Sequence, residues 1–323
     1  MRHGLLLVLC TFSTFCSAQT LLKVKAFPGA AALPLIVGAT HGFFEKHGLR
    51  VEALFTQSSQ EQRDDLANGA VQIAHTAVDN AVAMVERAKH DVVIVAGGDS
   101  SMNEFFVQPD VRSFADIRGR TLVVDAPNTA YALQARKILL MNGLKAGVDY
   151  KIHSAGNTGL RYRAMQENRE YAAAMLGPPI SAIAPSAGFR SLGRAVDLLG
   201  AYQAGGVVAL RGWAQANADT LERYLAGLIE ASRWTVAPQN RAAGAKLLMD
   251  RFKLEPKVAE LTMEWLADPR FGLAPDAAFD LQGFRNVLAL RAELEGDWGG
   301  KPPAPEKYLD LRYYDNALKR ISR

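Results

Sequence analysis

The fold is decided by residues 50–74, which read RVEALFTQSSQEQRDDLANGAVQIA. Residues 50–55 are rich in strand-favouring side chains and predict a strand, and residues 60–68 predict a helix that stops at Gly69. Residues 71–74 then predict the next strand. A strand, a crossover helix and a second strand in this order favour parallel pairing, in an open α/β sheet covered by helices.

The same alternation continues on both sides of this stretch. Further strands are predicted at residues 22–26, 91–96, 121–124, 150–153, 172–176, 196–199 and 207–210. Helices are predicted at residues 33–45, 79–89 and 129–141, and the chain after Arg211 is mainly helical, at residues 217–234, 241–252, 256–266 and 277–292. Because the strand and helix pattern restarts near residue 104, the chain is expected to form two α/β lobes with a helical C-terminal region.

The lobe boundaries follow from this restart. Residues 19–101 and 203–323 are expected to form lobe 1, which is discontinuous, and residues 102–202 to form lobe 2. The chain would cross between the lobes near residues 97–100 and 201–206, which both contain glycines. Glycine suits segments that must absorb backbone rotation, although the same residues also mark ordinary turns.

The first eighteen residues predict export. Arg2 precedes a short apolar run, and small residues at Cys16 and Ala18 suit cleavage near Ala18. This order is typical of a cleavable signal peptide, and the run is shorter than the about 20 apolar residues that a membrane-spanning helix needs. The alternative is a buried first strand or helix. The expected location of the mature protein is the periplasm.

Composition narrows the classes of function. The chain has 323 residues and a net charge of +4, without a block of basic residues, which argues against nucleic acid as a partner. Its only two cysteines, Cys10 and Cys16, lie in the predicted signal, so the mature chain would have no disulfide and no thiolate. The histidines show no metal-binding spacing, and no cofactor or metal is expected.

Two motifs carry a resemblance to a known family. Residues 37–52 include the segment Gly42-Phe43-Phe44-Glu45-Lys46-His47-Gly48-Leu49, and residues 114–124 read FADIRGRTLVV. With residues 66–74 and 308–315, they resemble the nitrate/sulfonate/taurine-type substrate-binding proteins of ABC importers. The resemblance covers essentially the whole mature chain. It implies a type II periplasmic-binding fold, related to the superfamily that binds thiamin pyrimidine precursors, with a cleft between the lobes. It also implies a monomer that docks on an inner-membrane permease.

Candidate ligand-binding residues are those just beyond the predicted strands, because open α/β sheets bind ligands at the carboxyl ends of their strands. Short polar groups at helix starts and free helix N–H groups would hold an acidic group, and aromatic rings would stack on a flat ligand. The residues predicted to bind the ligand are Phe27, Pro28, Gly29, Ser58, Ser59, Thr76, Asp79, Asn128, Thr129, Tyr131, Gly177 and Tyr202.

Each candidate also has an ordinary structural role. The Ser, Thr and Asn residues could be helix N-caps, and Phe27 could belong to a core. Arg161 could grip an anion, although a solvated surface position is the commoner role. Asp79 could cap a helix or, if it faces the cleft, favour a ligand with an N–H group.

The predicted function is that of a periplasmic solute-binding protein, not an enzyme, which closes its cleft over a small organic anion of the sulfonate or aromatic carboxylate class. A pyrimidine or another nitrogenous ligand is the alternative for the cargo. Two other functions stay open. One is an enzyme like the pyrimidine-precursor synthase, for which His75 would be the residue to examine, and the other is a ligand sensor for a receptor kinase.

Overall fold

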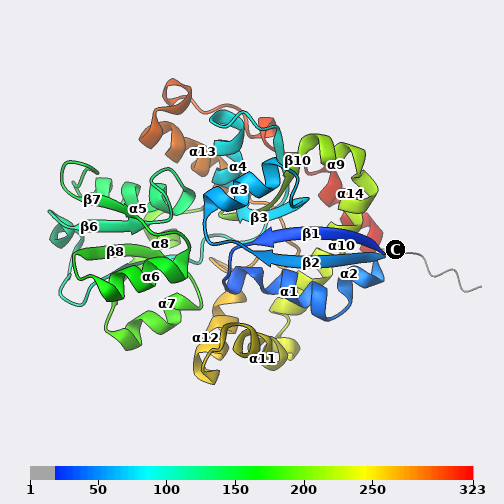
Figure 1. Ribbon diagram of the computed structural model, residues 1–323, viewed down its shortest axis with the longest axis horizontal. Helices are drawn as coiled ribbons and strands as arrows, with labels where there is room; N and C mark the ends of the chain where they lie inside the picture. Colours follow the sequence, from blue (N-terminus) through cyan, green and yellow to red (C-terminus); the bar gives the residue numbers. More distant parts are fainter. Residues whose placement is uncertain (1–18, 323) are drawn as a thin grey trace, which may run out of the picture.

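Two five-stranded sheets form the framework of the protein, as seen in a computed structural model that describes residues 19–322 (Figure 1). The predicted signal, residues 1–18 with both cysteines, lies outside the described residues. The strands are β1 (Thr20–Ala26), β2 (Leu49–Phe55), β3 (Ile73–Ala77), β4 (Val92–Ala96), β5 (Glu104–Val107), β6 (Thr121–Val124), β7 (Lys151–Ser154), β8 (Tyr171–Leu176), β9 (Arg190–Arg194) and β10 (Gly205–Leu210).

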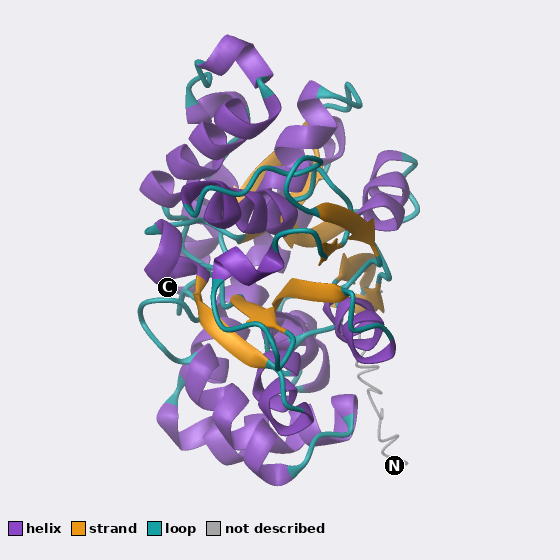
Figure 2. Ribbon diagram, turned by 90° about the vertical axis from the view of Figure 1, so that its left-hand side faces the viewer, coloured by secondary structure: helices purple, strands orange, loops and turns teal. Residues whose placement is uncertain are grey.

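Helices surround both sheets, so the strands lie in the interior (Figure 2). The α-helices of the strand-rich part are α1 (Leu33–Thr40), α2 (Phe43–Lys46), α3 (Ser59–Ala67), α4 (Val78–Glu86), α5 (Ala130–Met141), α6 (Thr158–Glu167), α7 (Ile180–Ile183) and α8 (Ala195–Leu199). Those of the C-terminal part are α9 (Arg211–Ala216), α10 (Ala218–Val236), α11 (Arg241–Phe252), α12 (Pro256–Leu266), α13 (Leu281–Glu295) and α14 (Arg312–Ile321). The α/β fold class is thereby confirmed.

The two sheets share one topology. The first has the order β2-β1-β3-β10-β4, and the second has the order β7-β6-β8-β5-β9. Strands β1, β2 and β3 pair in parallel, as do β6, β7 and β8, as predicted. Strands β10 and β5 instead run antiparallel to both of their neighbours. Each of these two strands is the first after the chain crosses to the other sheet. It therefore starts at the edge where the other strands end and has to run in the opposite direction.

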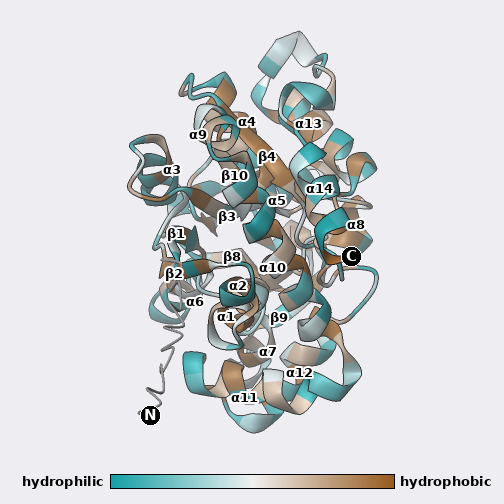
Figure 3. Ribbon diagram, turned by 90° about the vertical axis from the view of Figure 1, so that its right-hand side faces the viewer, coloured by the Kyte–Doolittle hydropathy of each residue, from teal (hydrophilic) through white to brown (hydrophobic). Residues whose placement is uncertain are grey.

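The core follows the sheets. One cluster packs α10 and α14 against a face of the first sheet, and a second packs α4 and α13 against its other face. The second sheet has its own clusters on both faces, and a further cluster joins α1, α11 and α12. The outer helices carry both hydrophilic and hydrophobic residues, as expected when one face packs and the other is solvated (Figure 3). None of the helices within residues 19–322 is long and apolar enough for a membrane crossing.

Several element predictions were wrong in instructive ways. The helix predicted at 33–45 is divided into α1 and α2, because Gly42 between them has a left-handed backbone with φ of 77°. The strand predicted at 196–199 is helix α8. Strands β5 and β9 and helices α6 and α14 were not predicted. The short strands lack a clear alternation, and α6 has no pronounced apolar face.

The two crossings run side by side, near residues 97–103 and 200–204. Gly97 and Gly205, at the crossings, are needed for close packing and do not adopt positive φ angles, whereas Gly200 has a φ of 80°. A Cβ atom on Gly97 would overlap the Ala278 carbonyl, and one on Gly205 would overlap the Asp99 carboxylate. The amide of Ala204 also donates to the carbonyl of Asp99 at 3.0 Å, which ties one crossing to the other.

Candidate functional site

A cavity of about 160 Å³ lies between the two sheets. Its wall includes the residues that follow β1 and β3 of the first sheet, and those that follow β6 and β8 of the second. The strand ends of both sheets therefore face one enclosed space, as the rule for open α/β sheets predicts. The volume is close to that of a cavity of about 150 Å³ that holds benzene in another protein, so a ligand of roughly six to ten non-hydrogen atoms fits.

Eight of the twelve residues predicted to bind the ligand line this cavity. They come from the ends of strands, from the loops that follow them or from the starts of helices, so all of them lie at the sheet edges that face each other. These residues are Phe27, Pro28, Gly29, Ser59, Thr76, Thr129, Tyr131 and Gly177.

The structure places the other four predicted residues elsewhere. Ser58 is the N-cap of α3 and accepts from the amide of Glu61, and Tyr202 packs in the core between α4 and α13. Asp79 is turned away from the cavity into a buried ion pair with Arg291. Asn128 contributes its carbonyl to the same arginine at 3.0 Å. A position after a strand therefore does not settle which way a side chain points.

Other wall residues were not among the predicted twelve. Asp125 directly follows β6, and Asn157 directly precedes α6. The strand-end rule could therefore have identified both residues. Asp99 lies in the first crossing, and Leu273 belongs to the distant helical region and carried no signal in the sequence. His75 and Arg161 were considered in the sequence analysis but were not among the twelve. The polar wall residues outside the twelve are His75, Asn80, Asp99, Asn103, Asp125, Asn157, Thr158 and Arg161.

Arg161 is the cation of the cavity wall, although a surface position was judged the commoner role for it. It is only 3% exposed. Its Nε and Nη2 donate to the carbonyl of Met175 at 3.2 and 3.0 Å, and Nη1 donates to the carbonyl of Gly156 at 2.8 Å. Because Nη1 carries two N–H groups, one of them has no acceptor among the described residues. Burial lowers the pKa of Arg161, and the nearby Asp125 carboxylate opposes this shift.

Two helices direct their N-termini at the cavity on the side of Arg161. Thr129, Ala130 and Tyr131 line it at the start of α5, which has no side-chain cap. Asn157 and Thr158 line it at the start of α6. Free N–H groups and a partial positive charge at helix starts favour a negative or acceptor group. The free N–H groups at the starts of α5 and α6 and the unused N–H of Arg161 together make this side of the cavity a surface of hydrogen-bond donors, here called the donor surface.

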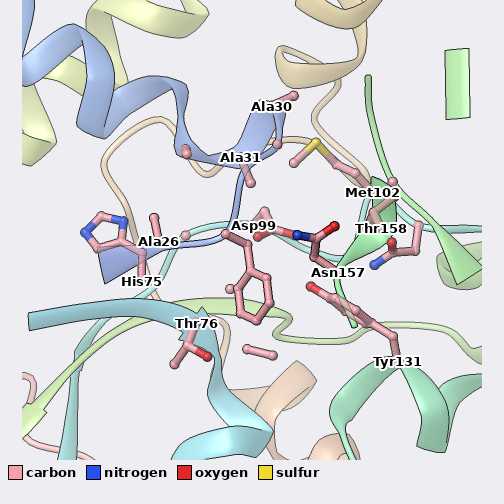
Figure 4. A pocket seen from close by; sticks show the side chains of 18 of the residues that line it. Ala26, Ala30, Ala31, His75, Thr76, Asp99, Met102, Tyr131, Asn157 and Thr158 are labelled. Atoms are coloured by element: carbon pink, nitrogen blue, oxygen red, sulfur yellow. The ribbon is translucent and has the colours of Figure 1, made fainter. Parts of the chain in front are cut away.

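His75 lines the opposite side, at the end of β3 (Figure 4). Its Nε2 lies 2.6 Å from the hydroxyl of the fully buried Tyr224. Burial lowers the pKa of His75 to about 4, because the charged imidazolium loses its hydration there. The ring is therefore neutral at pH 7.

Asp99 lies in the middle of the wall, and the hydroxyl of Tyr131 points towards this part of the cavity (Figure 4). The Oδ1 of Asp99 accepts from the amide of Ser101 at 3.0 Å. Burial raises the pKa of Asp99 to about 6, and main-chain N–H groups limit the rise. Burial also raises the pKa of Tyr131, and the charge of Asp99 adds to this effect. Tyr131 therefore stays a neutral phenol.

The lips of the cavity are joined by direct hydrogen bonds. The amide of Asn157 donates to the carbonyl of Gln57 at 2.9 Å, and the amide of Ser59 donates to Asp125 Oδ2 at 3.1 Å. The amide of Ala30 donates to the carbonyl of Pro178 at 3.0 Å. Each bond joins a segment of the first sheet to a segment of the second, so the structure shows a closed cleft.

Comparisons with known proteins agree with this architecture. Residues 30–173 match the model of the family described as NMT1/THI5 like. No curated protein matches the sequence. A protein from Bordetella bronchiseptica RB50 is 18% identical, with a TM-score of 0.79, over 95% of this chain and 99% of its own.

Two of the other similar structures have names that state a ligand. The periplasmic nitrate-binding protein NrtA from Synechocystis PCC 6803 is 15% identical, with a TM-score of 0.77, over 94% of this chain and 89% of its own. The alkanesulfonate-binding protein SsuA from Xanthomonas axonopodis pv. citri, bound to MOPS, is 17% identical, with a TM-score of 0.71, over 92% of this chain and 98% of its own. The chain therefore has the periplasmic binding protein fold that the sequence resemblance implied, and its residues 30–173 are similar to the NMT1/THI5 like family.

Proposed function

We propose that this protein is an exported solute-binding protein that closes two lobes over a small solute and delivers it to the permease of an ABC importer. The observation that carries the proposal is the enclosed cavity of about 160 Å³ whose wall comes from both sheets. Lobe 1 would comprise residues 19–101 and 203–323, and lobe 2 residues 102–202. In this proposal the periplasm is the location, and the protein acts as a monomer.

The route of the chain supports a hinge between the lobes. Within residues 19–322, two segments cross between the sheets, and both lie at the cavity wall, where Asp99 and Gly205 are in contact. Rotation about two adjacent crossings opens a cleft without disturbing either core. The names of the similar structures support the same reading, since they include binding proteins for nitrate and for an alkanesulfonate.

For the solute, we propose an organic molecule with an acidic or acceptor group that lies against Arg161 and the starts of α5 and α6. The unused N–H of Arg161 is buried, so a ligand oxygen there would remove an uncompensated donor. The apolar part of the solute would contact Phe27, Met102 and Ile180, which also line the cavity.

An enzyme is the rival function, because His75 is in the wall. Its lowered pKa leaves it neutral, and its Nε2 is engaged with Tyr224, which suits a structural or solute-contacting role better than proton transfer. If solute recovered from the protein were chemically changed, the protein would be an enzyme and not only a binding protein. The other function left open by the sequence, a ligand sensor whose closed form binds a receptor kinase, stays a prediction.

Closure is the property to measure. The two cysteines lie in residues 1–18, so cysteines introduced at Gln60 of α3 and Gln166 of α6 can carry spin labels without a competing thiol in the mature chain. The exported protein is freed of co-purified solute and titrated with organic acids of suitable size. The expected result is a saturable shortening of the label distance with a bound solute that is recovered unchanged. A distance that no binding solute alters would contradict the proposal.

A control pair of labels placed at Gln60 and Glu52 reports on one sheet alone. Both residues are exposed and belong to the part of the chain around the first sheet. Their separation should not respond to the solute, because closure moves the lobes as rigid bodies. A change in this pair would indicate local rearrangement instead of closure.

A further inference from the structure

Hydrogen-bond acceptors gather on the cavity wall beyond the donor surface of Arg161. Asp99, Asp125 and Asn80 all line the cavity. Asn80 is 2% exposed, and its Nδ2 donates to Thr76 Oγ1 at 2.9 Å and to Ser59 Oγ at 3.2 Å, which leaves Oδ1 without a partner. Oδ1 of Asp125 also has no partner. Buried acceptors without partners are uncommon in folded proteins and need a reason.

Asp99 adds a formal charge to this group of acceptors. It is 7% exposed, and its carboxylate accepts main-chain N–H groups, including that of Ser101, but forms no ion pair within residues 19–322. Burying a carboxylate without a counter-charge is costly, and this cost is why the pKa of Asp99 is raised. The side chain nevertheless faces the cavity and not an apolar core (Figure 4).

The balance of charges in the wall limits what the cavity can enclose. Two carboxylates, Asp99 and Asp125, face one cation, Arg161. A solute with only an acidic group would add a third negative charge to an enclosed site of low dielectric, where like charges repel strongly. A solute that also carries a protonated nitrogen would bring a positive charge and N–H donors to these acceptors.

We propose that the solute is a small zwitterion whose protonated amine binds Asp99, with Asp125 and Asn80 as further acceptors, while its acidic group lies at Arg161. This inference rests on the proposed function and specifies the chemical class of its solute. Asp99 is then a specificity-determining residue, which rejects acids of the same shape that lack the nitrogen.

Matched pairs of small molecules test this directly. The exported protein, freed of co-purified solute, is titrated at pH 7.5 by calorimetry with glycine and acetate, β-alanine and propionate, and 2-aminoethanesulfonate and ethanesulfonate. Each pair keeps the acidic group and differs in the ammonium. At least one amine-bearing member should bind at least about tenfold more tightly than its partner, since a charge-assisted hydrogen bond of about 1.5–3 kcal/mol is at stake.

The variant Asp99→Asn keeps the shape and the acceptor for Ser101 but removes the charge. It should reduce the ratio within the preferred pair to about threefold or less, mainly by weakening the amine-bearing member. The control Asp315→Asn makes the same chemical change at an exposed position on α14 and should leave the ratio unchanged. If Asp99→Asn does not fold, the ratios of the unaltered protein still decide the question.

Two outcomes would overturn the inference. One is a panel in which every acid without nitrogen binds as tightly as its amine-bearing partner, and the other is a panel in which no amine-bearing member binds. Neither outcome removes the proposed function, because spin labels at positions 60 and 166 report on closure with any solute. A protein that closes on a simple acid would keep the function and lose the zwitterion.

Discussion

Two of the regions in which the lobes meet outside the crossings use different chemistry. At the lips of the cavity, the contacts are hydrogen bonds, most of them from main-chain donors of Ser59, Asn157 and Ala30. One further bond runs from the side chain of Asn157 to that of Gln57. Between α13 and α5, the contacts are the ion pairs Arg136–Glu295 and Lys137–Glu293. The fully buried Arg291 of α13 pairs with Asp79 of α4, on the same side, and reaches across with a hydrogen bond to the carbonyl of Asn128. Main-chain contacts of this kind form and break at little cost, whereas a buried ion pair is costly to disturb.

This difference indicates where motion starts and what resists it. Arg291 is held by both carboxylate oxygens of Asp79, at 2.7 and 2.6 Å, and donates to the carbonyl of Asn128 in the other lobe. The α13 region should therefore act as the pivot, and the lips should separate first. The following predictions test this contrast, from the largest expected effect to the smallest.

Replacing Arg291 by Met should lower the free energy of unfolding by about 3–5 kcal/mol, because Asp79 would stay buried without a counter-charge. Urea denaturation followed by circular dichroism measures the loss. The double variant Asp79→Leu, Arg291→Met removes both charges and should recover most of the stability. A single variant as stable as the unaltered protein would show that the buried pair between α4 and α13 does not stabilise this region.

Asp99 belongs to neither contact region, but its charge should make the crossings less stable at neutral pH. Its folded pKa of about 6 is above the unfolded value of 3.8, so the stability that protonated Asp99 contributes is fully present below pH 3.8 and lost as pH rises through 6. Asp99→Asn should therefore raise the free energy of unfolding at pH 7.5 by about 2 kcal/mol. The gain should disappear near pH 4.

His75 lies in the same wall, and its contribution to stability changes with pH in the opposite direction. The two contributions must therefore be separated. Its folded pKa of about 4 is below 6.5, so stability is lost as pH falls from 6.5 to 4. Urea unfolding at pH 4, 5, 6 and 7.5 should give a difference between Asp99→Asn and the unaltered protein that grows with pH. A constant difference would show that Asp99 acts through packing and not through its charge.

The sequence predicted the fold better than it predicted the site. Strand-rich runs such as residues 50–55 and 121–124 gave both lobes, because periodicity and breakers are local properties. The strand-end rule placed Phe27, Thr76 and Thr129 at the cavity for the same reason.

The residues that were misassigned depend on contacts between distant segments. Asp79 faces an arginine 212 residues away in sequence, and nothing local to the helix start reveals that partner. The burial of Arg161 depends on the carbonyls of Met175 and Gly156, which the fold brings to it. A side chain after a strand can turn to the cavity or to a core, and only the packed structure decides between them.

At the lips, Gln57→Ala should weaken closure while leaving the stability of each lobe nearly unchanged. The substitution removes the side-chain acceptor of Asn157 Nδ2, at 3.2 Å, but keeps the main-chain bond. A neutral hydrogen bond of about 0.5–1.5 kcal/mol that exists only in the closed form should raise the apparent Kd about two- to tenfold. The label distance between positions 60 and 166 measures the closed fraction. An unchanged Kd would mean that the lips do not favour closure.

The smallest effect is expected at the rim of the α13 region, where Lys137 pairs with Glu293. The Glu293 side chain is 47% exposed, so water screens the pair. Glu293→Gln should change the free energy of unfolding by less than about 0.5 kcal/mol, and the change should disappear at 1 M salt. Urea denaturation at low and high salt measures it, with Arg291→Met in parallel. A loss at Glu293 as large as that at Arg291 would mean that the α13 contact is distributed over its surface charges, and the pivot would then depend on ionic strength.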